Sequence, residues 1–355
     1  MKLFIHFGIY KAGSSYLQYI LANSRNYLEH HKIYFPESKE DFKMLQGYIS
    51  KGNADGLAQA LNMEDASHSQ LILTQWFQQA KKQQCTSVLI SAEALVHQLA
   101  RENSLKVLKK AAKASGFNQI HAMGFFRDLA DHAISTYKHR AKSGKIPDYK
   151  HWIKEVYETP NLLENLAKIR SNNSDISWTF RKFQKNSSIL EEAFFQDWLQ
   201  INVPEFSGKP TVNESVTLSE VFLMNEIKKK YPLVTDYFVH LLTSLPSAEK
   251  GKDKELENYI GSTFFISLTK RTSGMMALNK FLDPKEQLVL MDEGKLNNIN
   301  DDYVPNLNFS EKQIHLILEK IEFFKGIKGN LIILRRKIAK KLPDSTVKIL
   351  FFNTK

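Results

Sequence analysis

The first residues that could do chemistry together lie near the start of the chain, directly after a short apolar run at residues 3–7. They read Gly8-x-x-Lys11-Ala12-Gly13-Ser14-Ser15. An apolar run that ends in a glycine turn and enters a helix points backbone N–H groups and the positive end of the helix dipole at one place. The stretch therefore predicts a site for a phosphate or a similar anion. The alternative is a plain strand–helix connection whose glycines bind nothing.

The position of the lysine separates two kinds of phosphate chemistry. The loop of nucleotide triphosphatases has its lysine after the second glycine, and it works with a magnesium ion held by an aspartate at the end of another strand. Here Lys11 precedes Gly13 by two residues, and the next strongly apolar run, residues 87–91, is followed by Glu93 rather than by an aspartate. We therefore expect a loop that binds a nucleotide phosphate without a metal ion. Such a loop suits the transfer of a group that is neutral once detached, such as a sulfuryl group.

A second pair of residues follows the apolar run at residues 119–126. Arg127 leaves the tip of this expected strand, and Ser135 lies eight residues later, about two turns into the following helix. An arginine fork and a hydroxyl placed in this way can hold one phosphate together. Taken singly, each residue could be an ordinary helix residue, so the prediction depends on the two motifs occurring together.

The two motifs resemble the 5′-phosphosulfate loop and the 3′-phosphate motif of sulfotransferases that use 3′-phosphoadenosine-5′-phosphosulfate (PAPS). The likeness is greatest to bacterial members with loops of the type H-x-G-x-x-K-[TA]-G-[ST]-[ST]. A later segment, Asn213-Glu214-Ser215, is similar to one common in bacterial members and extends the resemblance over residues 1–230. The resemblance implies transfer of a sulfuryl group from PAPS to a hydroxyl of a carbohydrate or glycoconjugate. Adenosine 3′,5′-bisphosphate is then the product, and no metal is required.

The resemblance also implies roles for single residues. Lys11 would stabilise the bridging oxygen as the leaving phosphate gains charge. Glu93 would deprotonate the acceptor hydroxyl, helped by a pKa that burial raises; the alternative is a helix-end carboxylate that complements the dipole. His97, one turn later, is the reserve base or a solvated helix residue, and Tyr16 lies against adenine or in the core. The residues expected to bind the nucleotide are Lys11, Ala12, Gly13, Ser14, Ser15, Tyr16, Arg127 and Ser135.

Apolar runs alternate with helix-like stretches, which predicts an α/β fold with a parallel sheet and a ligand at the carboxyl ends of its strands. Besides the first strand, strands are expected at residues 32–35, 87–91, 119–126, 176–180 and 188–190. Helices are expected at residues 14–31, 69–84, 105–114, 129–142, 191–199 and 311–324. His6 lies inside the first apolar run and is expected to be a core residue. We predict a three-layer, P-loop NTPase-like core of the sulfotransferase type at residues 1–230. A mainly helical C-terminal extension, residues 231–355, could pack on it as one domain.

The composition indicates a cellular compartment and a class of ligand. The chain has 355 residues, of which 43% are hydrophobic, so it can bury the core of one large domain or two. A single cysteine, Cys85, excludes an internal disulfide. Because Met1 runs directly into the first apolar run and no stretch approaches the ~18–20 apolar residues of a membrane span, we expect a cytoplasmic protein. The net charge of +11 favours anionic ligands, but no nucleic-acid-binding module is recognisable, and nucleic acid is not an expected partner.

A basic segment at residues 335–342 combines five basic residues with apolar ones. It predicts either a solvated helix face or a peripheral contact with an anionic surface such as that of the inner membrane.

Two other functions stay open at the level of sequence. A nucleotide-dependent kinase with a degenerate loop would need magnesium and a metal-holding carboxylate, which we do not find. A non-catalytic nucleotide- or glycan-binding protein would have little need for the combination of Lys11, Ser14, Ser15, Glu93, Arg127 and Ser135. The sequence predicts neither the identity of the acceptor nor the oligomeric state.

Overall fold

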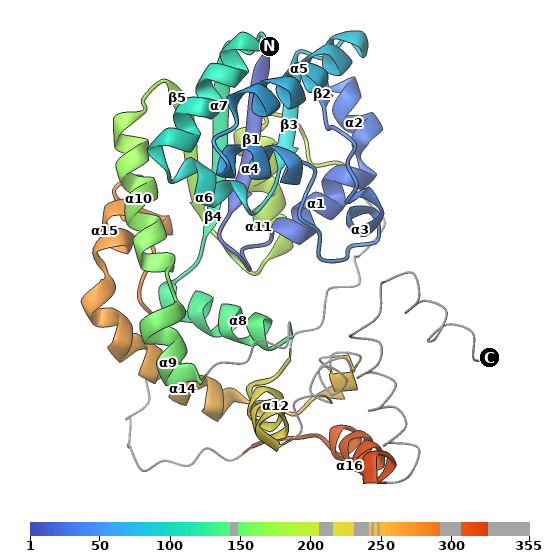
Figure 1. The fold of residues 1–355 in the computed structure, drawn as a ribbon, viewed down its shortest axis with the longest axis vertical. Helices are drawn as coiled ribbons and strands as arrows, with labels where there is room; N and C mark the ends of the chain where they lie inside the picture. Colours follow the sequence, from blue (N-terminus) through green and yellow to red (C-terminus); the bar gives the residue numbers. More distant parts are fainter. Residues whose placement is uncertain are drawn as a thin grey trace, which may run out of the picture. The chain divides into compact units, whose positions relative to one another are not determined.

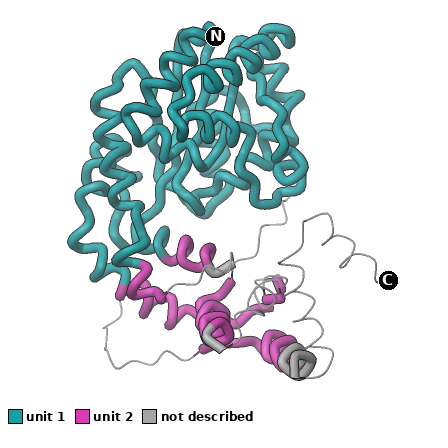
Figure 2. Tube along the Cα trace, in the orientation of Figure 1, with its two compact units in different colours: residues 1–133, 153–213, 264–294 teal, residues 134–152, 214–263, 295–355 magenta. Residues whose placement is uncertain are grey.

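The computed structural model describes residues 1–142, 148–205, 216–230, 241–242, 245–246, 249–291 and 307–325. The chain forms two compact units that interleave along the sequence (Figure 2). The first unit comprises Met1–Ala133, Ile153–Asn213 and Phe264–Gly294, and the second comprises Ile134–Trp152, Glu214–Thr263 and Lys295–Lys355. Neither unit coincides with the predicted domains 1–230 and 231–355, which stay predictions.

The first unit is built on a five-stranded sheet in which every strand pair is parallel (Figure 1). The strand order is β2-β3-β1-β4-β5. The strands are β1 Lys2–Gly8, β2 Ile33–Tyr34, β3 Ser87–Ser91, β4 Gln119–Phe126 and β5 Ile176–Lys182. Helices flank the sheet, so the prediction of an α/β protein with a central parallel sheet is confirmed.

The strand register brings the predicted site residues to one edge of the sheet. His6 of β1 lies beside Ser91 of β3 and Met123 of β4. Because the three central strands run in the same direction, their carboxyl ends finish close together. The chain leaves this edge at residues 9–13, 92–94 and 127–128, which include the glycine loop, Glu93 and Arg127.

Two of the predicted elements are wrong, and the helices of the described residues are more numerous than the sequence predicted. Their bounds are α1 Ser14–Asn23, α2 Arg25–His30, α3 Asp41–Leu45, α4 Asp55–Asn62, α5 Ala66–Lys82, α6 Leu95–Leu99, α7 Glu102–Ala114, α8 Leu129–Lys142, α9 Tyr149–His151, α10 Thr159–Asn172, α11 Ser187–Glu191, α12 Leu218–Lys230, α14 Lys254–Leu268, α15 Ser273–Asn279 and α16 Glu311–Lys325. The single helix predicted at residues 14–31 is wrong, because the chain breaks at Ser24. There the side chain of Asn23 competes with the helix by donating to the carbonyls of Tyr19 (2.9 Å) and Leu45 (3.4 Å).

The strand predicted at residues 188–190 is also wrong, since these residues lie in α11. The side chain of Asn186 accepts a hydrogen bond from the N–H of Ser188 (3.0 Å) and caps the helix. The capping residue decides the conformation of this short apolar segment.

Aromatic side chains pack the core against both faces of β1. On one face, Phe4 lies edge-on to Trp198 with ring centroids 5.3 Å apart. On the opposite face, Phe7 packs against Trp178 (6.2 Å) and Phe180 (6.4 Å) of β5. Burial of an aromatic side chain of this size contributes about 1.5–3 kcal/mol. The strand that carries the glycine loop is therefore held firmly in the sheet.

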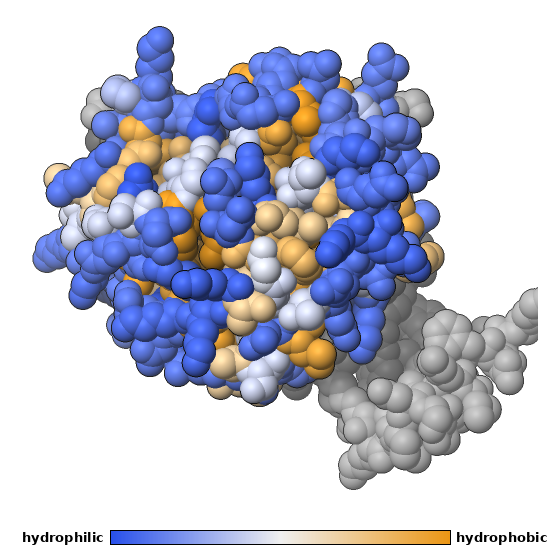
Figure 3. Space-filling view, turned by 90° about the horizontal axis from the view of Figure 1, so that it is seen from above, coloured by the Kyte–Doolittle hydropathy of each residue, from blue (hydrophilic) through white to orange (hydrophobic). Residues whose placement is uncertain are grey.

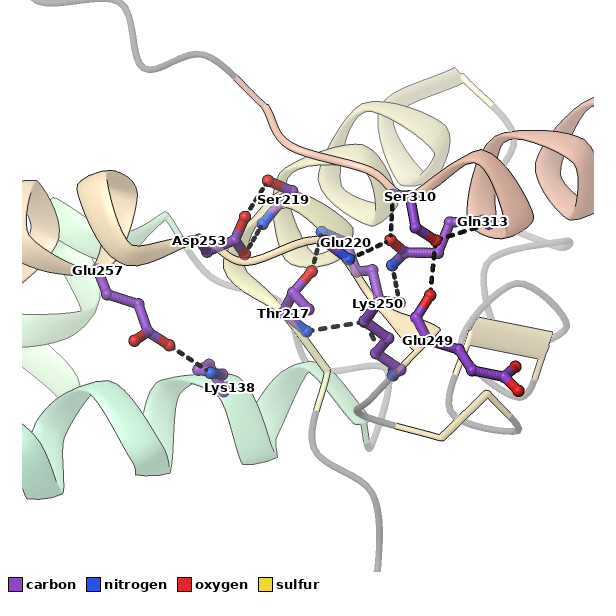
Figure 4. A network of polar contacts seen from close by, with 11 residues as sticks. Lys138, Thr217, Ser219, Glu220, Glu249, Lys250, Asp253, Glu257, Ser310 and Gln313 are labelled. Atoms are coloured by element: carbon purple, nitrogen blue, oxygen red, sulfur yellow. Dashed lines mark hydrogen bonds and ion pairs between the residues drawn. The ribbon is translucent and has the colours of Figure 1, made fainter.

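In the second unit, a buried polar network connects α12 and α16 to the segment at residues 249–253 (Figure 4). Thr217 and Glu220 form a capping box at the start of α12: the N–H of Thr217 donates to Glu220 Oε2 (2.7 Å), and the N–H of Glu220 donates to Thr217 Oγ1 (3.1 Å). The same carboxylate accepts from Lys250 Nζ (3.2 Å) and from Gln313 Nε2 (2.7 Å). Because Glu220 is fully buried, this complete set of partners is what makes the ion pair tolerable.

The face seen from above is mostly hydrophilic, with hydrophobic residues in groups between hydrophilic ones (Figure 3). Within the described part of the chain, no helix is both long enough and apolar enough to cross a membrane. The basic segment at residues 335–342 and the Asn213-Glu214-Ser215 segment lie outside the described residues.

Candidate functional site

The glycine loop enters α1 through two residues in the left-handed conformation. Lys11 has φ 66° and Gly13 has φ 84°, a region that favours glycine. Gly13 stands at the N-cap position of α1, and no described side chain caps the helix there. The first turn also carries no acidic residue. The N–H groups at this helix end therefore point to a place where an anion could bind.

Ser14 supplies a second observation at the same place. Its side chain is 2% exposed, and no described residue lies in ordinary hydrogen-bond geometry with its hydroxyl, although Glu93 is near enough for that hydroxyl to lower the pKa of the carboxyl. A ligand oxygen could therefore accept a hydrogen bond from the Ser14 hydroxyl. Ser15 beside it is half-buried, and Ala12 is buried.

Glu93 lies on the turn after β3, where Lys11 and Ser14 influence its ionisation. Burial raises the pKa of Glu93 to about 7, although the positive charge of Lys11 and the nearby Ser14 hydroxyl act in the opposite direction. A carboxyl group with a pKa near neutrality can accept a proton and release it again, as a general base must. The structure therefore brings together three of the predicted site residues, contributed by the loop, by α1 and by the end of β3.

His97, the reserve base, lies in α6 with its ring centroid 6.0 Å from that of Tyr10, a residue of the glycine loop that is 40% exposed. Although its ring reaches the surface, neighbouring protein atoms desolvate it enough to lower its pKa, an effect that the charge of Glu158 opposes. His97 is thus a neutral imidazole near neutral pH, one helical turn beyond Glu93.

Arg127 reaches the glycine loop from the end of β4. Its Nη1 donates to the carbonyl oxygen of Lys11 (3.1 Å), and its guanidinium lies over the ring of Phe183, 5.4 Å from the centroid. Arg127 therefore contacts the glycine loop, as predicted from its place at the same edge of the sheet. Ser135 lies in the part of α8 that belongs to the second unit, so a phosphate site shared with Arg127 stays a prediction.

Sequence reasoning missed the segment at residues 183–191, which lies against the loop. A Cβ atom at Gly13 would lie 2.8 Å from Phe183 and 2.9 Å from Leu190, so both side chains pack directly on this glycine. The hydroxyl of Tyr16 donates to Glu191, and burial together with that carboxylate raises the pKa of Tyr16 to about 12. The signal that could have found Phe183 is its place directly after β5, at the same edge of the sheet.

Among the described residues, no group of three or more histidine, cysteine, aspartate or glutamate side chains is arranged to hold a metal ion. Comparison of the chain with protein-family models, with curated proteins and with solved structures found no match.

Proposed function

We propose that this protein transfers a sulfuryl group from PAPS to a hydroxyl of a carbohydrate or glycoconjugate acceptor. The observation that carries the proposal is the meeting of Lys11, Ser14 and Glu93 at a helix N-terminus, with Arg127 bonded to the same loop. The acceptor class rests on the resemblance of the motifs. With it we propose a core of the sulfotransferase type and a cytoplasmic location.

The proposed reaction is an in-line displacement at sulfur. The acceptor oxygen forms a bond to sulfur while Glu93 takes the hydroxyl proton. The bond from sulfur to the bridging oxygen of the 5′-phosphate breaks, and its electron pair stays on that oxygen. Lys11 stabilises the charge that develops there, and the N–H groups of α1 together with Ser14 hold the phosphate. Adenosine 3′,5′-bisphosphate leaves as the product, and the scheme uses no metal ion.

A charged carboxylate beside a phosphate site would normally repel the ligand. Two features reduce this repulsion here. The pKa of about 7 leaves a sizeable fraction of Glu93 protonated near neutral pH, and Lys11 places a positive charge beside it. The fraction of Glu93 that is ionised near neutral pH, which the charge of Lys11 favours, is the form that can take the acceptor proton.

Calorimetric titration of the full chain with two ligands tests the proposal. We expect adenosine 3′,5′-bisphosphate to bind more tightly than ATP with magnesium, because the site offers hydrogen-bond donors and positive charge for phosphates and uses no metal. Tighter binding of magnesium-ATP would favour the kinase. Binding of the bisphosphate without any turnover of PAPS would favour the non-catalytic binding protein.

A further inference from the structure

At the end of β3, four buried polar side chains form a continuous chain of hydrogen bonds. The proposed transfer does not use these side chains. Ser50 Oγ donates to Gln18 Oε1 (2.5 Å), and Gln18 Nε2 donates to Ser91 Oγ (3.3 Å). Ser91 Oγ in turn lies 2.8 Å from His6 Nδ1. His6 and Ser91 are fully buried, and Gln18 is 1% exposed. We call these four residues the Ser91 network.

The Ser91 hydroxyl has a defined partner on each side. Burial lowers the pKa of His6 to about 3, so its imidazole is neutral at ordinary pH. Ser91 Oγ accepts a hydrogen bond from Gln18 Nε2 and shares a second one with His6 Nδ1, in which the tautomer of the imidazole decides which atom donates. Removal of the Ser91 hydroxyl would leave the Gln18 amide and the His6 nitrogen without this partner in a dry interior, which is costly.

The backbone of Ser91 is held as tightly as its side chain. Its N–H donates to Asn53 Oδ1 (2.7 Å), and the side chain of Asn53 also donates to the carbonyl of Leu89 (3.4 Å). A Cβ atom at Gly52 would lie 2.0 Å from the carbonyl oxygen of Ser91, so only a glycine allows this approach. The N–H of Ala92 donates to the carbonyl of His6 (3.2 Å). The end of β3 is therefore fixed on all sides, directly before Glu93.

Gln18 connects this strand end to the helix that carries Ser14. Ser14 and Gln18 are four residues apart in α1, so both project from the same face of the helix. Ser14 lies near Glu93, and Gln18 is bonded to Ser91, two residues earlier in the chain. The helix and the strand end are thus joined at two neighbouring points.

We propose that Ser91 and Gln18 are positioning residues that hold the Glu93 carboxylate beside Lys11 and Ser14. Their effect on turnover rests on the proposed sulfuryl transfer, whereas the position of Glu93 does not. Neither residue touches the reacting atoms. Their effect is to fix the end of β3 relative to α1, so that the base and the phosphate loop keep one geometry.

Two substitutions and a matched control test this inference. Ser91→Ala removes the central hydroxyl, and Gln18→Met keeps the length of the side chain but donates no hydrogen bond. Ser104→Ala is the control, because Ser104 is a fully buried serine in α7 whose hydroxyl has no partner among the described residues. We expect kcat to fall about tenfold or more in both test variants, as for other groups that orient a functional residue. The affinity for adenosine 3′,5′-bisphosphate should stay within about twofold, since the loop itself is intact.

A readout that does not need activity separates this inference from the proposed function. In protein with carbon-13 at the glutamate carboxyls, the Glu93 resonance is the one that Glu93→Gln removes, and its pH titration gives the pKa of Glu93. We expect both test variants to move this pKa toward the ordinary glutamate value by about 0.5 unit or more, while Ser104→Ala leaves it in place. A shifted titration in a protein whose wild type transfers no sulfuryl group would support the positioning and refute the proposed function. If both test variants match Ser104→Ala in turnover and in titration, the positioning role is overturned.

Discussion

Glu93→Gln separates a catalytic carboxylate from a structural one, because the two roles predict opposite changes in stability. The substitution keeps the size of the side chain and removes its ionisation. The folded pKa of about 7 lies above the ordinary value of 4.5, so the folded protein holds this proton more tightly than the unfolded chain does. The stability that the protonated carboxyl contributes is therefore fully present below about pH 4.5 and is lost as the pH rises through about 7.

The difference between the two pKa values corresponds to about 3.4 kcal/mol at 1.36 kcal/mol per pH unit. Because Glu93 is partly exposed, solvent screening reduces this to about 1–2 kcal/mol. Between about pH 4.5 and about pH 8, the free energy of unfolding of Glu93→Gln should therefore rise by about 1–2 kcal/mol relative to the wild type. Turnover should fall by about 10²–10⁴-fold over the same range, because the amide cannot take the acceptor proton.

Urea unfolding of both proteins across this pH range measures the first effect, and single-turnover transfer from labelled PAPS measures the second. Glu102→Gln, at the exposed start of α7, is the control for a carboxylate that complements a helix dipole and forms an exposed ion pair with Lys106 (3.5 Å). Loss of the Glu102 carboxylate should lower the free energy of unfolding by about 0.3–1 kcal/mol where the carboxylate is ionised, whereas Glu93→Gln should raise the free energy of unfolding. A Glu93→Gln protein that behaves like this control and keeps its turnover would refute the reasoning. His97 would then be the next base to test.

Three further substitutions and one control test separate parts of the structure. Lys11→Ala should raise the activation free energy by about 2–4 kcal/mol, which lowers kcat, and it should leave donor affinity nearly unchanged. An unaltered kcat would show that Lys11 has no part in the mechanism. Arg127→Ala should weaken binding of adenosine 3′,5′-bisphosphate by about 1.5–3 kcal/mol and spare a nucleotide without the 3′-phosphate. Equal losses for both ligands in calorimetry would show that the bond from Arg127 to the Lys11 carbonyl supports the loop instead. Lys250→Met leaves the buried carboxylate of Glu220 without its charge partner and should destabilise the second unit by about 3–5 kcal/mol. Lys312→Met, which breaks an exposed pair, should change stability by at most about 1 kcal/mol, and equal melting curves for the two variants would contradict the account of the buried pair.

The sheet could be predicted from sequence because its strands are apolar runs bounded by turn residues. The run at residues 87–91 coincides with β3, and the run at residues 119–126 coincides with β4. Short segments whose conformation depends on one capping side chain could not be predicted in this way. Asn23 ends α1 early, and Asn186 starts α11 where an apolar pattern indicated a strand.

The meeting of the glycine loop, Glu93 and Arg127 could also be predicted, since the carboxyl ends of neighbouring parallel strands share one edge. The place of Phe183 directly after β5 indicates the correct edge of the sheet, but nothing local in the sequence of Phe183 or Leu190 indicates that they pack on Gly13. The same holds for the bond between Gln18 and Ser91, which joins residues 73 positions apart. His6, expected to be a core residue, is fully buried as expected, but its hydrogen bond to Ser91 depends on the strand register, which apolar patterning does not reveal.

The most direct test of the central claim is the fate of sulfur-labelled PAPS when it is mixed with excess protein and a panel of polysaccharide acceptors. We predict that adenosine 3′,5′-bisphosphate and labelled acceptor appear in equal amounts. In Lys11→Ala, and likewise in Glu93→Gln, the formation of both products should slow by the same factor. Without a suitable acceptor, slow release of the label to water should still depend on Lys11. If the wild-type protein consumes PAPS no faster than Lys11→Ala does, with every acceptor and with water, the protein is not a sulfotransferase of the kind proposed.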